Sequence, residues 1–244
     1  MTAFTYDLHI HSCLSPCGDN DSTPHSIAGM GLLAGLQIMA LTDHNTTRNC
    51  PAFFEAAREH GIIPVAGMEL TTAEDIHMVC LFPTLEAAMD FGREVDSRRI
   101  RIDNRPDIFG EQLVMDATDT VIATEPHLLS NATTIPVEET DGLCAYYGGV
   151  CYPAHIDREA NGIIAVLGTL PPDPPFTCVE LHDITREADY RARYDMARCV
   201  AVTGSDAHYL WDIRDGAHTI ELEADPADEQ EVRDRLLDYI RRGL

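Results

Sequence analysis

The sequence predicts a single α/β domain whose strands form a parallel barrel. The chain has 244 residues, which suits one large domain better than two ordinary ones. Seven short apolar stretches alternate with helix-like segments, an order typical of a parallel sheet with helical crossovers. Each stretch also runs into a His, Asp or Glu, which indicates that one side of the barrel carries polar groups.

The apolar stretches are the expected strands. In chain order they are residues 6–11, 38–44, 64–69, 76–82, 150–155, 178–182 and 200–208. Their polar residues lie at the C-terminal ends, except for His77, which lies at the start of its stretch. In barrels the reactive groups gather at the C-terminal ends of the strands. We therefore expect these polar residues to meet.

Six helices are expected between and after the strands. Pro24 is at the first helical position of a helix that ends near Leu36. Gly61 ends the next helix, residues 52–60. The others begin at Thr84, span 138–147 and 186–198, and run from Asp225 to Leu244.

Residues 98–135 break this alternation. Within them, 111–116 and 120–125 flank a polar turn, and the pattern predicts a β-hairpin excursion from the barrel. A surface insertion is the interpretation we favour. The alternative is that the excursion forms a lid or an oligomer contact, so a homo-oligomer is not excluded.

Composition limits the classes of function. No apolar run is long enough to cross a membrane, and the first residues contain no basic leader, so we expect a cytoplasmic protein without a membrane partner. Cysteines inside apolar runs, such as Cys80 and Cys151, are typical of reduced, buried thiols. The formal charge of -24 opposes long-range attraction to nucleic acid, so stable nucleic-acid binding is not expected. All 17 basic residues are Arg, which excludes Schiff-base chemistry.

The spacing of the histidines and acids suits a metal centre. Residues i and i+2 of a strand point to the same side, so His9 and His11 can aim at one place, as can Asp206 and His208. One His-x-His pair is a weak signal. A core with six histidines and three acids and no metal, however, would bury many unpaired polar groups.

Some polar residues are expected to lie outside the ligand set. Only one of the adjacent residues Asp43 and His44 can point inward, and we expect His44 to be the ligand and Asp43 a supporting or capping group. Four other histidines are expected to be ordinary surface or hydrogen-bonded residues: His25, His60, His127 and His218.

The motifs around these residues resemble those of the PHP (polymerase and histidinol phosphatase) superfamily. They are Leu8-His9-Ile10-His11-Ser12, Leu41-Thr42-Asp43-His44-Asn45, Gly67-Met68-Glu69, Ile76-His77, Pro153-Ala154-His155 and Gly204-Ser205-Asp206-Ala207-His208. They follow the family's order over nearly the whole chain. The resemblance implies a distorted (β/α)7 barrel and a metal-dependent phosphoesterase with two or three ions.

The resemblance also implies three groups of ligands. The first ion takes His9, His11, Glu69 and Asp206. Glu69 bridges to a second ion, which His77 and His155 also hold. The third takes His44, His208 and one residue from the loop after His11.

The loop after His11 departs from the family pattern. Many relatives have Ser-Asp-Gly there, whereas this chain has Ser15-Pro16-Cys17-Gly18-Asp19-Asn20-Asp21. Asp19 is the favoured third-site ligand, and Cys17 and Asp21 stay open as alternatives.

A cluster of His and carboxylates suits Zn²⁺, Mn²⁺ or Fe²⁺. The hypothesis is that a hydroxide bridging the first two ions, which Glu69 and Asp206 help to hold, attacks phosphorus in line. Arg158 and Arg48 lie on loops that leave ligand-bearing strands, and each either clamps phosphate or forms an ordinary loop salt bridge. His182 either contacts substrate, acts as a general acid or simply packs.

The expected function is hydrolysis of a phosphate monoester of a small metabolite or nucleotide. A nucleotide or oligonucleotide phosphodiesterase and a non-catalytic metal-binding module are the alternatives. Metal-dependent hydrolysis of C–N bonds is less favoured, because such amidohydrolases commonly use a carboxylated Lys and the chain has no Lys.

Overall fold

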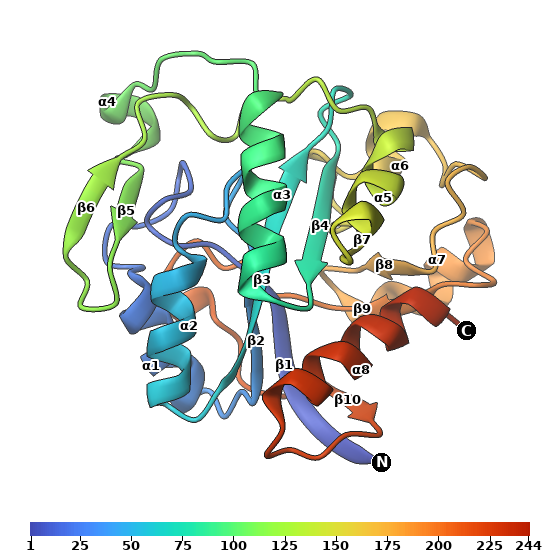
Figure 1. Cartoon of the computed structure of the whole chain (residues 1–244). Helices are drawn as coiled ribbons and strands as arrows, with labels where there is room; N and C mark the ends of the chain where they lie inside the picture. The colour runs from blue at the N-terminus through green and yellow to red at the C-terminus, as the bar shows by residue number, and fades with distance from the viewer.

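All seven predicted strands are present in the computed structural model, which describes residues 1–244 (Figure 1). They are β1 (Thr2–Ile10), β2 (Ile38–Leu41), β3 (Ile63–Thr71), β4 (His77–Phe82), β7 (Val150–Pro153), β8 (Cys178–Glu180) and β9 (Val200–Val202). An additional strand that the sequence did not predict, β10 (Thr219–Leu222), pairs antiparallel with the first half of β1.

The seven strands close into a ring. β1, β2, β3, β4 and β7 are hydrogen-bonded neighbours in that order, and β8 pairs with β9. The backbone N–H of Ile156 donates to the carbonyl of Glu180 over 2.9 Å and joins the end of β7 to β8. The N–H of Asp206 donates to the carbonyl of His9 over 2.9 Å, which joins the segment after β9 to β1. This ring confirms the distorted (β/α)7 barrel.

The expectation of an all-parallel sheet is wrong at β4. β3 and β4 form an antiparallel hairpin in which Thr71 is opposite His77. The start of β4 therefore lies at the same end of the barrel as the C-terminal end of β3. This reversal explains how His77, at the beginning of its strand, joins residues that end theirs.

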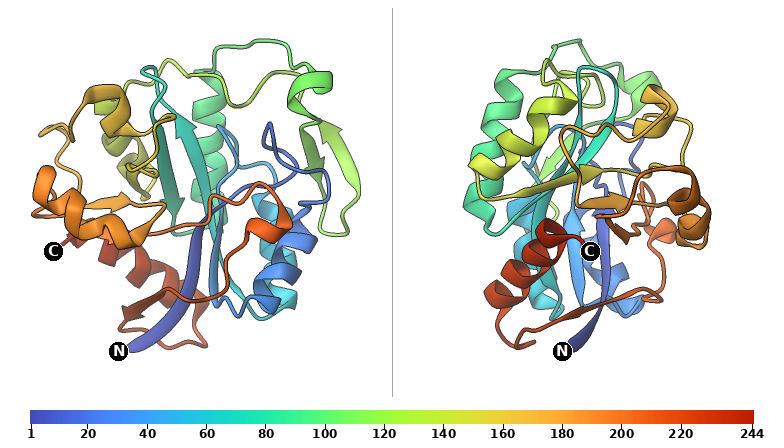
Figure 2. Two further views of the ribbon diagram at one scale, coloured as in Figure 1. Left: turned by 180° about the vertical axis from the view of Figure 1, so that it is seen from behind. Right: turned by 90° about the vertical axis from the view of Figure 1, so that its right-hand side faces the viewer.

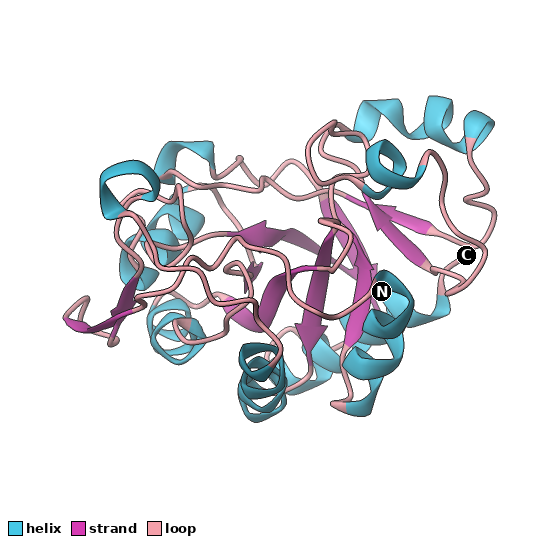
Figure 3. Ribbon diagram, turned by 90° about the horizontal axis from the view of Figure 1, so that it is seen from above, coloured by secondary structure: helices cyan, strands magenta, loops and turns pink.

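The six predicted helices are present with shifted bounds. They are α1 (Pro24–Leu33), α2 (Cys50–Glu59), α3 (Leu85–Ser97), α5 (Val137–Tyr146), α7 (Glu187–Arg193) and α8 (Glu229–Arg242). Four short helical segments were not predicted: α4 (Pro106–Phe109), α6 (Ile163–Leu167), η1 (Ile184–Arg186) and η2 (Leu210–Asp212). Viewed from above, the helices surround the strands (Figure 3). None of them is long and apolar enough to span a membrane.

Alternation along β3 separates the core from the polar interior. Met68 and Leu70 belong to the larger apolar cluster, which includes residues of α1, α2 and α3. Ile63 and Val65, on the opposite face, belong to a second cluster that α8 covers. Glu69 follows Val65 on that same face at strand spacing. The barrel interior is thus apolar at one end and polar at the other.

The predicted hairpin forms from β5 (Leu113–Met115) and β6 (Val121–Thr124), which pair antiparallel. It stands beside the barrel and away from α8 in opposite views (Figures 1 and 2). The Asn49 side chain donates to the carbonyl of Leu113 over 3.1 Å and accepts from the N–H of Met115 over 2.9 Å. These bonds attach the hairpin to the N-terminus of α2.

Candidate metal centre

Glu69 lies at the middle of the polar end of the barrel, fully buried. Nitrogen atoms of five histidines approach its two carboxylate oxygens. The distances are 3.2 Å from His9, 3.3 Å from His11, 3.0 Å from His44, 2.9 Å from His77 and 3.1 Å from His155. A carboxylate shared by so many nitrogens is the arrangement expected of a bridging ligand.

Three overlapping groups of potential ligand atoms surround this carboxylate, each with its atoms within 4.8 Å of one another. They are His9, His11, Glu69 and Asp206; then His44, Glu69 and His77; then His11, His44 and His208. The grouping brings together eight of the nine predicted ligands, because His155 also contacts Glu69.

Asp19 and His155 are the predicted ligands outside these groups, and of the two only His155 contacts Glu69. The backbone N–H of Asp19 donates to the carbonyl of His208 over 3.0 Å, and the Asp19 carboxylate accepts from the N–H of Asp21 over 2.8 Å. Asp19 therefore lies beside the third group, and its role as a ligand stays a prediction. His25, His60, His127 and His218 are outside all three groups.

The donor set fits metal ions. Two atoms that face the centre, His44 Nδ1 and Glu69 Oε2, are buried and have no hydrogen-bond partner, although they lie 3.0 Å apart. Buried polar groups are normally paired. A shared cation would explain why the lone pairs of these two atoms point toward each other without a hydrogen bond. A site with histidine nitrogens and carboxylate oxygens suits Zn²⁺, Mn²⁺ or Fe²⁺.

Electrostatics divide the histidines into two kinds. Burial opposes protonation of His11, but the nearby carboxylates of Asp206 and Glu69 outweigh it and raise the pKa of His11 to about 9. The pKa of His9 is also raised, against burial, by Glu180, Glu69 and Asp206. Burial lowers the pKa of His44 to about 3 and that of His208 to about 4, and the charge of His11 adds to both effects.

The carboxylates are held as anions. Burial opposes ionisation of Glu69, but His77, His9 and His44 keep its pKa well below the usual value. Burial likewise opposes ionisation of Asp206, and His9 and His11 lower its pKa. The centre therefore presents negative oxygen ligands to any bound cation.

Glu180 is a buried residue of the centre that the sequence analysis missed. Its carboxylate lies 3.0 Å from His9 Nδ1, on the other side of the ring from Glu69. It also accepts the backbone N–H of His155 over 3.1 Å. One side chain thus orients a ligand from β1 and the backbone that carries a ligand after β7. A signal was present, since Glu180 is two residues before His182 in the same predicted strand, residues 178–182.

Asp43 supports the centre from behind His11, as expected. It accepts from the hydroxyls of Ser12 and Ser15, each over 2.7 Å. The Ser15 hydroxyl oxygen in turn lies 2.9 Å from His11 Nδ1 and accepts the backbone N–H of His44 over 3.1 Å. This chain of contacts fixes the orientation of two histidine ligands.

Two of the predicted ligands have left-handed backbone conformations. His155 has a φ of 27° and Asp206 a φ of 51°, values that non-glycine residues seldom adopt. Both follow short strands, β7 and β9. Strained backbone of this kind tends to cluster at functional sites.

Arginines reach the edge of the centre beside Asp206. The Arg158 guanidinium forms an ion pair with Asp206 and lies 3.1 Å from His182 Nδ1. Arg214, which the sequence analysis did not single out, lies 3.0 Å from His182 Nε2. Burial and then these two cations lower the pKa of His182. Arg48 instead pairs with Glu125 over 3.0 Å, which agrees with the salt-bridge alternative.

Comparison with known proteins identifies the family. The sequence model of the PHP domain matches residues 7–158, more than half of the chain. The error-prone DNA polymerase of Symbiobacterium thermophilum is 36% identical over 74 residues, 30% of this chain and 7% of the polymerase. The chain spans less than half the length of the curated relatives it matches.

Solved structures share the fold. The lesion-specific endonuclease PfuEndoQ of Pyrococcus furiosus aligns with a TM-score of 0.64 and 17% identity, covering 98% of this chain and 56% of that one. A Bifidobacterium adolescentis protein named for metal-dependent phosphoesterase activity aligns with a TM-score of 0.53 and 19% identity, covering 98% and 96%. The family motifs, the barrel and the grouped ligands agree, and the chain belongs to the PHP domain family.

Proposed function

We propose that this protein is a metal-dependent hydrolase that removes phosphate from a monoester of a small metabolite or nucleotide. The observation that carries the proposal is the buried Glu69 carboxylate, with nitrogens of five histidines at 2.9–3.3 Å. Two or three divalent ions of Zn²⁺, Mn²⁺ or Fe²⁺ bound there would supply a Lewis acid and an activated water.

Glu69 and Asp206 have the charge and placement to hold these ions from two sides. Glu69 projects from β3, and Asp206 follows β9 across the barrel. His9 and His11 lie between them, and His11 Nε2 is 3.3 Å from Glu69 and 3.2 Å from Asp206. The ligand positions are fixed by the barrel backbone, so the substrate meets a preorganised centre.

Arg158 is placed to bind the phosphoryl group. It pairs with Asp206, so its guanidinium lies directly beside a proposed ligand, and part of its side chain is exposed. A guanidinium can bind two oxygens of a phosphate at once. His182 contacts both Arg158 and Arg214, and its lowered pKa keeps it neutral near pH 7. A neutral ring favours positioning of the arginines over donation of a proton as a general acid.

Within the hydrolases, the phosphoesterase reading is favoured over the amidohydrolase one. In this proposal Glu69 would take the bridging role that a carboxylated Lys has in many amidohydrolases, and the chain has no Lys. The structural relatives do not separate the two, since a phosphoesterase and an amidohydrolase both align with a TM-score of 0.53, so the missing Lys carries the choice.

Turnover of p-nitrophenyl phosphate by the metal-replete protein tests the proposal. We expect hydrolysis that a chelator abolishes and that added Mn²⁺ or Zn²⁺ restores, with rates at least about 100-fold lower in His77→Ala and Asp206→Ala. Glu55→Gln, an exposed substitution on α2, is the matched control and should keep full activity. If the metal-replete protein hydrolyses no phosphoester in a broad panel, the proposal is wrong.

A second candidate function is hydrolysis of a phosphodiester in nucleic acid. Tyr209 and Trp211 directly follow the predicted ligand His208, and their rings stack 4.8 Å apart at 16°. Trp211 is 73% exposed, so a planar base can stack on it. The endonuclease among the structural relatives supports this candidate. It predicts that Trp211→Ala raises KM for a short oligonucleotide at least about fivefold while p-nitrophenyl phosphate turnover is unchanged.

A further inference from the structure

A cavity of about 360 Å³ near the polar end of the barrel has no assigned role. Its walls come from residues 46–48, the second half of α3 and the 98–135 excursion. Four arginines line it, Arg48, Arg93, Arg99 and Arg101, together with His127, and Met89 is its one apolar residue. We call it the arginine cavity.

The charge of this cavity is opposite to that of the chain. Its four arginines face two carboxylates, Asp96 and Glu125, which leaves a formal charge of +2 when His127 is neutral. The whole chain carries -24. Nearly a quarter of its 17 arginines gather at this one place. A concave surface of one charge sign focuses the field and attracts ions of the other sign.

Arg99 connects the walls of the cavity, and Arg93 and Arg101 have N–H donors that face solvent. Arg99 is buried and bonds to Asp96 over 2.9 Å and to the carbonyl of His127 over 3.2 Å, so it joins α3 to the excursion. The side chains of Arg93 and Arg101 are 71% and 51% exposed, and their carboxylate partners are Asp90 and Asp96. A guanidinium has five N–H donors, so most donors of these two face solvent.

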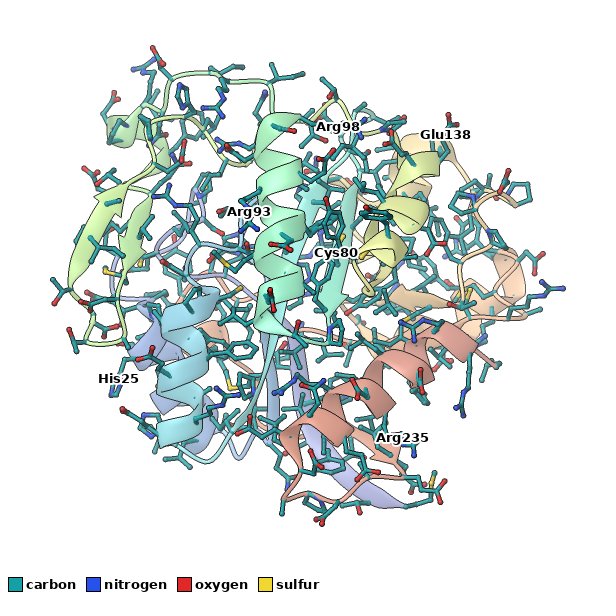
Figure 4. The ribbon with its side chains drawn as sticks, viewed as in Figure 1. His25, Cys80, Arg93, Arg98, Glu138 and Arg235 are labelled. Carbon is teal, nitrogen blue, oxygen red and sulfur yellow. The ribbon has the colours of Figure 1, made fainter.

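The arginine cavity opens at the same end of the barrel as the metal centre. Arg48 is four residues after His44, so their Cα atoms are at most about 14 Å apart. α3 follows the reversed strand β4 and therefore returns to this end. Figure 4 shows Arg93 on the side of α3 that faces the β5–β6 hairpin. An anion in the cavity would therefore lie at the polar end of the barrel but apart from the predicted ligands.

We propose that the arginine cavity is a second anion site, which binds a phosphate group other than the one at the metal centre. Planar guanidinium groups with fixed spacing bind phosphate oxygens bidentately. The phosphate belongs either to a distal part of an extended substrate, such as a nucleic-acid strand, or to a separate small phosphorylated effector. The site does not depend on the proposed function, because its residues are not ligands.

Equilibrium dialysis with radiolabelled inorganic phosphate tests the site on the metal-replete protein. The wild type should bind two phosphates per chain, one at the metal centre and one in the cavity. The double variant Arg93→Gln/Arg101→Gln should lose one of them, with at least tenfold weaker binding. The control Arg58→Gln/Arg235→Gln removes two half-exposed, ion-paired arginines elsewhere and should keep both.

Kinetics then identify the source of the phosphate. For an extended substrate, Arg93→Gln/Arg101→Gln raises KM for an oligonucleotide and leaves p-nitrophenyl phosphate turnover unchanged. For an effector, inorganic phosphate alters p-nitrophenyl phosphate turnover in the wild type without competing, and the double variant loses this response. Phosphate binding that is the same in the wild type and the double variant overturns the proposal, whether or not the metal centre is active.

Discussion

Glu180 is the residue whose role is the most informative, because it touches a metal ligand without facing the centre. Its carboxylate lies 3.0 Å from His9 Nδ1, which fixes the tautomer that turns Nε2 toward Glu69. Such supporting carboxylates commonly change metal affinity by about 10–100-fold when they are mutated.

We therefore expect Glu180→Gln to weaken binding of the first ion by about 10–100-fold while the protein stays folded. Competition with a fluorescent chelator measures the affinity, and circular dichroism checks the fold. Glu55→Gln, which changes the same side-chain type on the surface, should bind metal like the wild type. Equal affinities for all three proteins would show that Glu180 only fills space.

The histidines predict how metal affinity depends on pH. His11 has a pKa of about 9 and is therefore protonated near pH 7 in the metal-free protein, and Glu180, Glu69 and Asp206 raise the pKa of His9 in the same direction, which favours its protonated form. A metal ion binds only the neutral ring and must displace these protons. Affinity should therefore fall as pH decreases below about 9, by about tenfold per unit for each competing proton.

Calorimetric titrations in buffers of different ionisation enthalpy count the released protons. At pH 7 we expect one to two protons per ion from the first group, and fewer above pH 9. Binding heats that are the same in every buffer would contradict the assignment of His9 and His11 as ligands.

At the scale of single residues, the sequence identified the residues that meet at the centre better than the residues that support them. His9 and His11 were found because strand spacing places them on one side. Arg214 could not be found in this way, because it lies in a loop and only the folded chain brings it 3.0 Å from His182. No local sequence pattern predicts a contact between residues so far apart in the chain.

At the scale of elements, β4 shows that the periodicity of a sequence does not give the direction of a strand. The apolar run 76–82 predicted a strand correctly, but alternation is the same in both directions of a strand. The short connection between Thr71 and His77 is the only local signal of a hairpin, since a parallel crossover needs a dozen or more residues. That connection also accounts for the position of His77 at the start of its run.

Gly204, in the segment after β9, packs closely against His9 of β1 behind the centre. A Cβ atom there would lie 2.6 Å from His9 Cβ and 3.0 Å from a Glu180 oxygen. Gly204→Ala should therefore displace both residues, destabilise the fold by about 1–3 kcal/mol and weaken metal binding. Urea denaturation and chelator competition measure the two effects.

The matched control is Gly142→Ala in α5, where a Cβ atom has no neighbour within 4 Å. This change should stabilise the protein by about 0.4–1 kcal/mol and leave metal binding unchanged. If both alanine variants bind metal like the wild type, close packing at Gly204 does not position His9.

At the scale of the whole molecule, net charge alone was an incomplete guide to nucleic-acid binding. The formal charge of -24 argued against stable nucleic-acid binding, yet a sum does not say where charges lie. Four arginines line one cavity near the centre, and the exposed stack of Tyr209 and Trp211 follows a ligand. Nucleic-acid binding therefore stays open, as does an oligomeric state.

The cysteines agree with the expected chemistry of the interior. All eight are free thiols, and only Cys17 is exposed. Burial raises the pKa of Cys13 and Cys50 to about 12, so these thiols are neutral and unsuited to metal binding. This supports a centre built from His and carboxylates, while the cytoplasmic location stays a prediction.

The central claim is that Glu69 bridges at least two metal ions at the polar end of the barrel. Metal stoichiometry by mass spectrometry on the wild type and on Glu69→Gln tests it most directly. The account predicts two or three divalent ions per chain in the wild type and at most one in a folded Glu69→Gln protein. A wild type with fewer than two ions after metal loading, or a variant that retains them all, would contradict it.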